Sequence, residues 1–355
     1  MARVAPAALR ASWQHLAAAA APAARSSHSV TSMAGGVYAF GGEDAPRNAF
    51  DPFVHVFKGA GAGNPRAAWA QLPGPVPGGP LLGHGAAGLG HRLFVFGGRR
   101  GGANTFSGDA STAGETGELS VFDTQTQTWA QSPATPSSPL PEPRSFHAMC
   151  AAGGAGDGSV FLFGGCGVGG RLNDLWCLDP QSGRWRQLHP GGAEAPRARG
   201  GSALVAAADG SRLVLMFGFS GVQQGDLAVF DLADNRWKVL PQEEQTGDVP
   251  LPRSVFAAAR AGDAWPDQVI VYGGERVASD LGHEGAGAFT QELYVLDLAD
   301  LRWTALKSEG DVPVARGWMG MAPLETQARP ELLLFGGLDG GNRRLGDTWQ
   351  LTLEG

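Results

Sequence analysis

Short apolar runs that end in glycine recur along the whole 355-residue chain. Each run is rich in Val, Leu, Ile, Phe and Tyr and has the length and composition of a buried β-strand. The runs are VYAFGG, LFVFGG, VFLFGG, LVLMFGF, VIVYGG and LLLFGG, with their glycines at 41–42, 97–98, 164–165, 218, 273–274 and 336–337. Five steps that average 59 residues separate the first from the last. The pattern predicts six repeated β units and disfavours a helical solenoid, because no helical periodicity accompanies it.

A second apolar stretch and a Trp complete each of the first five units. Stretches such as NDLWCLD at 173–179 and QELYVLD at 291–297 end near an Asp. The tryptophans that follow are Trp69, Trp129, Trp185, Trp237 and Trp303. The sixth unit ends before it reaches this Trp, whereas Trp13 precedes the first unit. We therefore expect a strand at 11–16 to complete the sixth unit.

Four short strands per unit, a double glycine and a following Trp are typical of kelch propeller blades. The sequence thus predicts an all-β fold, a six-bladed kelch β-propeller whose last blade is closed by the N-terminal strand. We expect a single domain over 1–355, with an N-terminal extension at 1–10. The successive repeat units are expected at 25–72, 81–132, 144–188, 199–240, 253–306 and 316–353.

The composition adds limits on the class of protein. The 55 Gly and 24 Pro, together with 10 Trp and 17 Phe, suit many short strands joined by tight turns. A net charge of −7 argues against a partner that is a nucleic acid. No apolar run reaches the roughly 20 residues of a membrane-spanning helix, so we expect no membrane partner. Cys150, Cys166 and Cys177 form no disulfide framework, which favours free thiols and a cytoplasmic location.

The strand order predicts a rim on one face of the propeller. Because antiparallel neighbours alternate direction, the residues after each double glycine lie on the same face as the residues that open the first strand of a unit. Five units open with an Arg and the second has Leu81; the arginines are Arg25, Arg144, Arg199, Arg253 and Arg316. We interpret these arginines as supports, because repetition itself indicates architecture. Arg99 and Arg171 share the rim without recurring, so they are better candidates for binding an anion.

The loop of the fifth unit breaks the repeat pattern. Glu275, Asp280 and His283 lie within nine residues and are interleaved with glycines. One imidazole with two carboxylates suits a divalent metal such as Fe(II), Mn(II) or Zn(II). An acidic surface loop with one His is also common, so the loop alone is weak evidence of a metal site.

Several motifs occur in order along essentially the whole chain: YAFGGE (38–43), PRSFHAM (143–149), ARGG (198–201), FGFSG (217–221), PRSVFA (252–257), GGE…GHEGAG (273–287) and ARGW (315–318). Together they resemble the plant specifier proteins and their close kelch relatives. These are the nitrile-specifier, epithiospecifier and thiocyanate-forming proteins. The resemblance implies an Fe(II)-dependent, non-redox lyase. Its substrates would be glucosinolate aglycones, which are thiohydroximate-O-sulfates, and its products nitriles, epithionitriles or thiocyanates.

Residue by residue, the resemblance implies iron ligands at Glu275 and His283. The intermediate Asp, expected four residues after the Glu, falls on Ser279, and Asp280 lies one residue further on. The substrate contacts that it implies are Arg99, Phe146, Arg171 and Trp318. The two arginines would hold the sulfate by bidentate hydrogen bonds, and the two aromatic residues would wall the variable side chain of the substrate.

Two classes of function stay open. The first is a metal-dependent lyase that acts on a sulfated or otherwise anionic small molecule. The second is a non-catalytic kelch module that binds a protein partner, which is a common use of this architecture. The repeat pattern explains the fold and does not choose between them.

Overall fold

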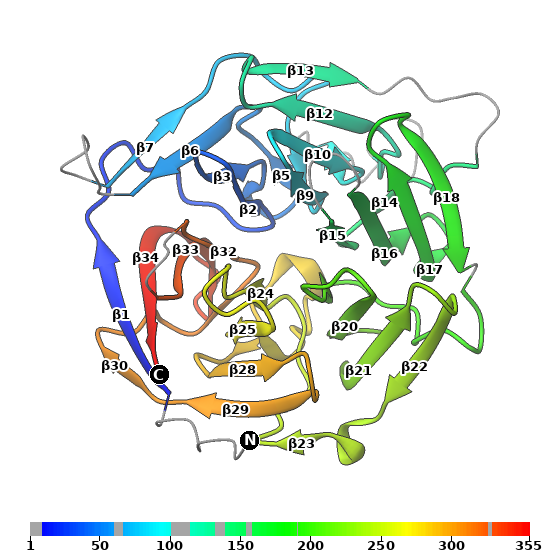
Figure 1. The fold of residues 1–355 in the computed structure, drawn as a ribbon. Helices are drawn as coiled ribbons and strands as arrows, with labels where there is room; N and C mark the ends of the chain where they lie inside the picture. The colour runs from blue at the N-terminus through cyan, green and yellow to red at the C-terminus, as the bar shows by residue number, and fades with distance from the viewer. Residues whose placement is uncertain are drawn as a thin grey trace.

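Six antiparallel sheets surround a central axis in the computed structural model, so the six-bladed propeller is confirmed (Figure 1). The structure describes residues 9–59, 67–100, 114–131, 139–153, 158–189, 191–325 and 329–355. Within these ranges the only helical segments are the short turns η1 (Gln242–Glu244) and η2 (Gly282–Glu284). No helix in the described ranges is long and apolar enough to cross a membrane.

Each blade contains four strands. The first blade contains β2 (Ser29–Met33), β3 (Gly36–Phe40), β6 (Val54–Lys58) and β7 (Ala68–Gln71). The second contains β9 (Gly85–Leu89), β10 (Arg92–Phe96), β12 (Leu119–Asp123) and β13 (Thr128–Gln131). The third contains β15 (Ala148–Ala152), β16 (Ser159–Gly167), β17 (Gly170–Asp179) and β18 (Arg184–His189). The fourth blade contains β19 (Ala203–Ala206), β20 (Arg212–Phe219), β21 (Gln223–Asp231) and β22 (Arg236–Leu240). The fifth contains β24 (Ala257–Arg260), β25 (Gln268–Tyr272), β28 (Leu293–Asp297) and β29 (Arg302–Leu306). The sixth contains β32 (Gly320–Pro323), β33 (Glu331–Asp339), β34 (Arg344–Glu354) and β1 (Arg10–Leu16).

Short strands extend this frame at the mouth and at the outer edge. At the mouth are the hairpins β4 (Glu43–Ala45) with β5 (Asn48–Ala49) and β26 (Glu275–Val277) with β27 (Ala288–Phe289). The mouth also contains the paired strands β8 (Leu81–Leu82) and β11 (Arg99–Arg100). It further contains β14 (Arg144–Ser145), which pairs with β16, and β31 (Arg316–Gly317), which pairs with β33. At the outer edge, β23 (Thr246–Gly247) and β30 (Ser308–Gly310) add parallel strands to the fifth and sixth blades.

The N-terminal strand closes the sixth blade, as the position of Trp13 predicts. β1 pairs antiparallel with β34 from Arg10 opposite Glu354 to Leu16 opposite Thr348. In Figure 1 the blue β1 lies beside the red β34, so the two ends of the chain meet in one sheet. Trp13 is buried, and its ring lies 4.9 Å from that of Tyr272 in the fifth blade.

The five repeating arginines are buried structural supports. Each is 0 or 1% exposed and forms an ion pair with an acid that lies shortly before or within the third strand of its own blade. The pairs are Arg25–Asp51, Arg144–Asp174, Arg199–Asp226, Arg253–Glu292 and Arg316–Asp347. Each Arg also donates from Nη1 to a carbonyl where the second strand turns. In the second blade, where Leu81 replaces the Arg, Arg100 pairs with Glu118 instead.

Glycines and tryptophans fit the blades together. Gly41 has φ of +66°, and a Cβ there would lie 2.6 Å from the imidazole of His84 in the next blade. The first glycine of the pair therefore allows both a left-handed turn and the close approach of a neighbouring blade. Trp69 is 2% exposed, contacts Phe57 and Phe335, and donates Nε1–H to Thr348. It thus packs the first blade against the sixth.

Candidate functional site

A closed ring of backbone hydrogen bonds surrounds the axis at the mouth. Each member lies two residues after the position of the repeating Arg, has φ between +49° and +63°, and donates its N–H to the equivalent carbonyl of the preceding blade. The six N···O distances are 2.6 to 2.9 Å, and the members are Ser27, Gly83, Phe146, Gly201, Val255 and Trp318. A positive φ is unusual for Val and Trp, so the ring holds these residues in a conformation that they seldom adopt. The backbone thereby fixes where their side chains enter the mouth.

A second ring comes from the residue that follows each glycine turn. Its members are Glu43, Arg99, Cys166, Phe219, Glu275 and Leu338. Each pairs with a strand-opening residue, as Arg99 does with Leu82 and Glu275 with Ser254. All six line one or the other of two cavities at the mouth.

The two cavities share the residues Phe146, Cys166 and Trp318. The Glu43 pocket, of about 60 Å³, is also lined by Ser27, Glu43, Arg47, Leu82, Arg99, Glu115, Ser145 and Leu338. The Arg171 pocket, of about 190 Å³, is also lined by Arg171, Gly200, Gly201, Phe219, Ser254, Val255, Glu275, Ala278, Ser279 and Gly282. Phe146 and Trp318 come from the third and sixth blades, and their rings meet edge to face with centroids 5.3 Å apart. The structure therefore brings the four predicted substrate residues to one mouth.

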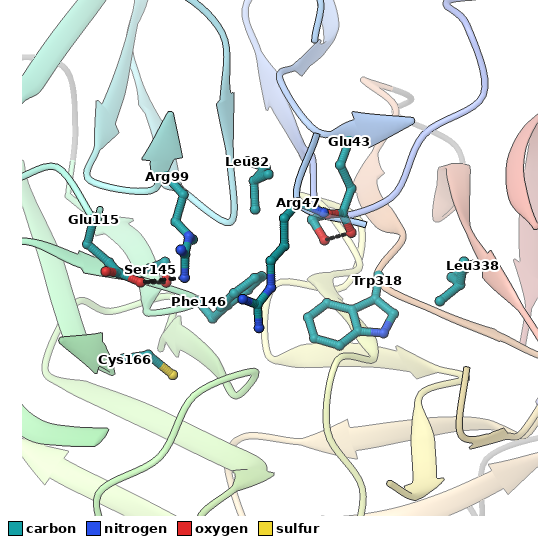
Figure 2. Close-up of a pocket in the computed structure, with 11 residues that line it drawn as sticks. Glu43, Arg47, Leu82, Arg99, Glu115, Ser145, Phe146, Cys166, Trp318 and Leu338 are labelled. Carbon is teal, nitrogen blue, oxygen red and sulfur yellow. Dashed lines mark hydrogen bonds and ion pairs between the residues drawn. The ribbon is translucent and has the colours of Figure 1, made fainter. Parts of the chain in front are cut away.

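Two ion pairs involve the charged residues of the Glu43 pocket: Arg99 pairs with Glu115, and Glu43 pairs with Arg344 at 3.4 Å. Arg99 Nη1 lies 3.2 Å from Oε1 of Glu115, which also accepts a hydrogen bond from Ser145. Glu43 is 8% exposed and accepts hydrogen bonds from the hydroxyls of Ser26 and Ser27. Figure 2 shows this pocket, with Arg47 extending toward Phe146 and Trp318.

The mouth is not a uniform ring of positive charge. The repeating arginines lie beneath it in buried ion pairs, and the two pockets together are lined by three arginines and three glutamates. Any preference for an anion must therefore come from the local surroundings of one guanidinium.

Arg171 has those surroundings. It opens the third strand of its blade on an exposed hairpin, and its Cζ lies 4.8 Å from the centroid of the Phe219 ring. In the part of the chain that the structure describes, no carboxylate forms an ion pair with Arg171. A guanidinium on an aromatic face is oriented without losing its charge, whereas Arg99 is partly neutralised by Glu115.

The fifth-blade loop places Glu275 in the Arg171 pocket and Asp280 outside it. Glu275 is 7% exposed, and burial raises the pKa of its carboxyl, against hydrogen bonds from Gln223 and from the backbone N–H groups of Gly287 and Ser279. Ser279 lines the same pocket as Glu275, whereas Asp280 is exposed and does not line it.

These positions bear on the metal prediction. The side chain of His283 lies outside the described part of the structure. Among the described residues, no three His, Cys, Asp or Glu side chains converge as metal ligands do. The described donors do not fit a three-ligand iron centre, because Asp280 lies outside the pocket and Ser279 offers only a hydroxyl. Fe(II) binding stays a prediction.

Comparison with known proteins places the chain in a family. Residues 27–274 match the KLHDC2/KLHL20/DRC7 Kelch-repeats domain. The chain belongs to the kelch-repeat family. A second comparison points to the specifier proteins: this kelch chain is 27% identical over 336 residues to the N-(sulfonatooxy)prop-2-enimidothioate sulfolyase of Thlaspi arvense. That match covers 89% of each chain. The suspected resemblance to specifier proteins is thus supported.

Two further comparisons describe other members and the fold. The kelch chain is 30% identical over 228 residues to Kelch domain-containing protein 3 of Homo sapiens. This match covers 60% of the present chain and 53% of the human protein. The solved structure of YjhT matches with a TM-score of 0.68 at 16% identity, over 96% of this chain and 99% of that one. This last likeness shows the fold alone.

Sequence reasoning missed part of the kelch mouth. It selected Arg99 and Glu275 from the second ring but passed over Glu43, Cys166 and Phe219. Aligning the residue after each glycine turn would have found them. It also missed Glu115, because this residue reaches Arg99 from a long loop that has no repeat position.

Proposed function

We propose that this kelch protein is a specifier-like sulfolyase that binds a thiohydroximate-O-sulfate in the Arg171 pocket and promotes loss of its sulfate. The observation that carries the proposal is the charge of Arg171, which has no ion pair among the described residues, in a pocket walled by Phe146, Phe219 and Trp318. An anionic head with a short apolar side chain matches this combination. The sulfolyase of Thlaspi arvense is named for a substrate of that class.

The reaction breaks the N–O bond of the substrate, and that electron pair leaves with the sulfate oxygen. For a nitrile, the C–S bonding pair completes the C≡N bond and the thiolate sulfur departs as elemental sulfur. For a thiocyanate, the organic group moves from carbon to the thiolate sulfur, and the former C–C pair completes the C≡N bond. Arg171 presents a planar fork of N–H donors that suits two sulfate oxygens, and its charge stabilises the negative charge that builds up on the leaving group. Phe146, Val255 and Trp318 pack against the organic part and limit the access of water. The ring of backbone hydrogen bonds holds these three side chains in place, so the site needs little reorganisation when the substrate arrives.

An Fe(II) ion, which the family resemblance implies, would supply a Lewis acid at Glu275. The loss of sulfate described for Arg171 does not include this ion, because the described donors do not fit a three-ligand iron centre. Dependence on iron is part of the proposal only as a condition to be tested.

The test supplies allyl thiohydroximate-O-sulfate, released in situ from its thioglucoside, and measures the products by gas chromatography. Parallel reactions contain anaerobic Fe(II) or a chelator. Wild-type protein should divert substrate from the spontaneous isothiocyanate to a nitrile or thiocyanate, and Arg171→Gln should lose most of this diversion. Identical products with and without protein, under both metal conditions, would reject the sulfolyase.

A protein-binding module is the second candidate, and the distribution of exposed apolar residues favours it. Among the described residues, eight large aliphatic side chains are exposed, and seven of them lie on loops or the short hairpin strand β26 at the mouth face. They are Leu140, Val168, Val222, Leu251, Val277, Leu281 and Val314. Clustered exposed apolar side chains often mark a protein interface.

Site-specific photo-crosslinking in the source cells would test this module. A photoreactive residue in place of Val222 should capture a discrete partner, whereas the same residue in place of Val239, on the outer strand β22, should not. Equal labelling from both positions would remove the argument for a protein-binding mouth.

A further inference from the structure

Phe219 occupies a position where the other blades carry a different kind of residue. In the fourth blade the glycine turn reads Phe217-Gly218-Phe219. Phe217 is buried and stacks on Trp303, so it belongs to the core between the fourth and fifth blades. Phe219 is half-buried and lines the Arg171 pocket. The core therefore explains the first Phe but not the second.

The backbone of Phe219 is fixed from both sides. Its N–H donates to the carbonyl of Gly200 at 2.8 Å, and its own carbonyl accepts from the N–H of Gly200 at 3.1 Å. This antiparallel bridge fixes the position of the Phe219 backbone, and so the point at which its phenyl ring enters the mouth. Arg171, by contrast, extends from an exposed hairpin, and a long exposed side chain loses much conformational freedom when it is held in one place.

We propose that Phe219 is the positioning residue of Arg171, and that it gives the pocket its preference for anions. This inference rests on the proposed function. The aromatic face attracts the guanidinium and holds it over the pocket, yet leaves its N–H fork and its full charge available for an oxyanion. A carboxylate in place of Phe219 would hold Arg171 equally well but would neutralise it, as Glu115 does to Arg99.

The experiment measures binding of two small probes by calorimetry. Phenyl sulfate carries the oxyanion, and benzyl alcohol is a neutral ligand with the same ring. Phe219→Leu keeps an apolar side chain and removes the aromatic face. It should weaken phenyl sulfate binding by about two- to fivefold more than it weakens benzyl alcohol binding, a difference in the range of an exposed cation–π contact. Phe219→Tyr, which keeps the ring, should bind both probes as the wild type does.

Phe219→Glu supplies a stronger contrast. It should remove the preference for phenyl sulfate over benzyl alcohol, because an ion pair would neutralise Arg171. Arg171→Gln should remove the same preference, and in that background Phe219→Leu should have no further effect on phenyl sulfate. A general loosening of the pocket would instead weaken both probes together, and that result would overturn the positioning role.

The outcomes separate the two proposals. If wild-type protein prefers phenyl sulfate and Arg171→Gln does not, but Phe219→Leu behaves as the wild type, the positioning role is wrong and the anion site stands. If wild type has no preference for phenyl sulfate, or keeps its preference in Arg171→Gln, both the anion site and the role of Phe219 are overturned.

Discussion

Arg144 and Asp174 form a two-point ion pair, with Nη1 2.6 Å from Oδ1 and Nη2 2.8 Å from Oδ2. The Arg is fully buried, and Asp174 Oδ2 also accepts a hydrogen bond from Trp176 Nε1. The pair connects the opening of the third blade to its third strand. An ion pair at the same position recurs in four other blades, and in two of them it is also two-point. The buried arginines therefore act as ties between the strands of a blade.

Removing the acid from one tie should destabilise the propeller. Asp174→Asn leaves the buried charge of Arg144 without its counterion, so we expect the free energy of unfolding to fall by about 3 kcal/mol. Urea denaturation followed by tryptophan fluorescence measures the change, with the exposed Asp234→Asn as control. The double change Arg144→Met with Asp174→Leu should recover much of the loss, because neither buried charge then remains. A single variant as stable as wild type would contradict the tie.

Trp13 should contribute to the stability of the whole ring. Trp13→Ala removes a large buried side chain from the contact between the sixth and fifth blades, so the free energy of unfolding should fall by about 3 kcal/mol. Gln14→Ala, one residue further along the same strand on its exposed side, should have little effect. If the two variants have the same melting temperature in a thermal scan, closure of the last blade does not depend on Trp13.

Buried histidines should make the fold sensitive to mild acid. Burial lowers the pKa of His28 and His84 from 6.5 to about 3, and that of His147 well below its ordinary value. Because the unfolded chain binds these protons first, the stabilising contribution is complete above pH 6.5 and is lost as the pH falls toward 3.

The measurement is the free energy of unfolding at several pH values between 7 and 4. His84→Gln should reduce the increase of the free energy of unfolding with pH by up to about 1.4 kcal/mol per pH unit, which corresponds to the binding of one proton. An unchanged slope would mean that His84 is protonated equally in the folded and unfolded chain.

Ser279 offers a direct test of the metal prediction. Ser279→Asp places a second carboxylate in the pocket that holds Glu275, so we expect tighter Fe(II) binding than in the wild type. Anaerobic calorimetry with Fe(II) measures it, and Asp280→Ala should leave the affinity unchanged because Asp280 is exposed and lies outside the pocket. His283→Ala should reduce binding. No Fe(II) binding by either the wild type or Ser279→Asp would reject this loop as a metal site.

Much of the fold could be predicted from the sequence because each blade repeats the same local requirements. The glycine turns and the displaced Trp13 predict six blades and their closure, since a missing Trp in one sheet must be supplied by another segment. The acidic partners of the buried arginines were not predicted. Asp51, Asp174 and Glu292 lie 26 to 39 residues from the arginines that they bind, and nothing in the spacing marks them.

The candidate site was only partly predictable, for a physical reason. Arg99 and Arg171 look alike in the sequence, since each is an Arg on the rim. Their chemistry differs because Glu115 approaches one and Phe219 the other, from segments 16 and 48 residues away. Asp280 lies outside the pocket that Glu275 and Ser279 line, and residue identity alone does not determine which of these neighbouring residues enters it.

The ring of six backbone hydrogen bonds has a consequence for how such proteins diverge. It uses only main-chain atoms, and it already accommodates Ser, Gly, Phe, Val and Trp at equivalent positions. Each member can therefore be replaced over evolutionary time without loss of the bond that joins its blade to the next. A lineage can change what enters the mouth of the propeller one blade at a time, while the frame that positions those side chains is inherited unchanged.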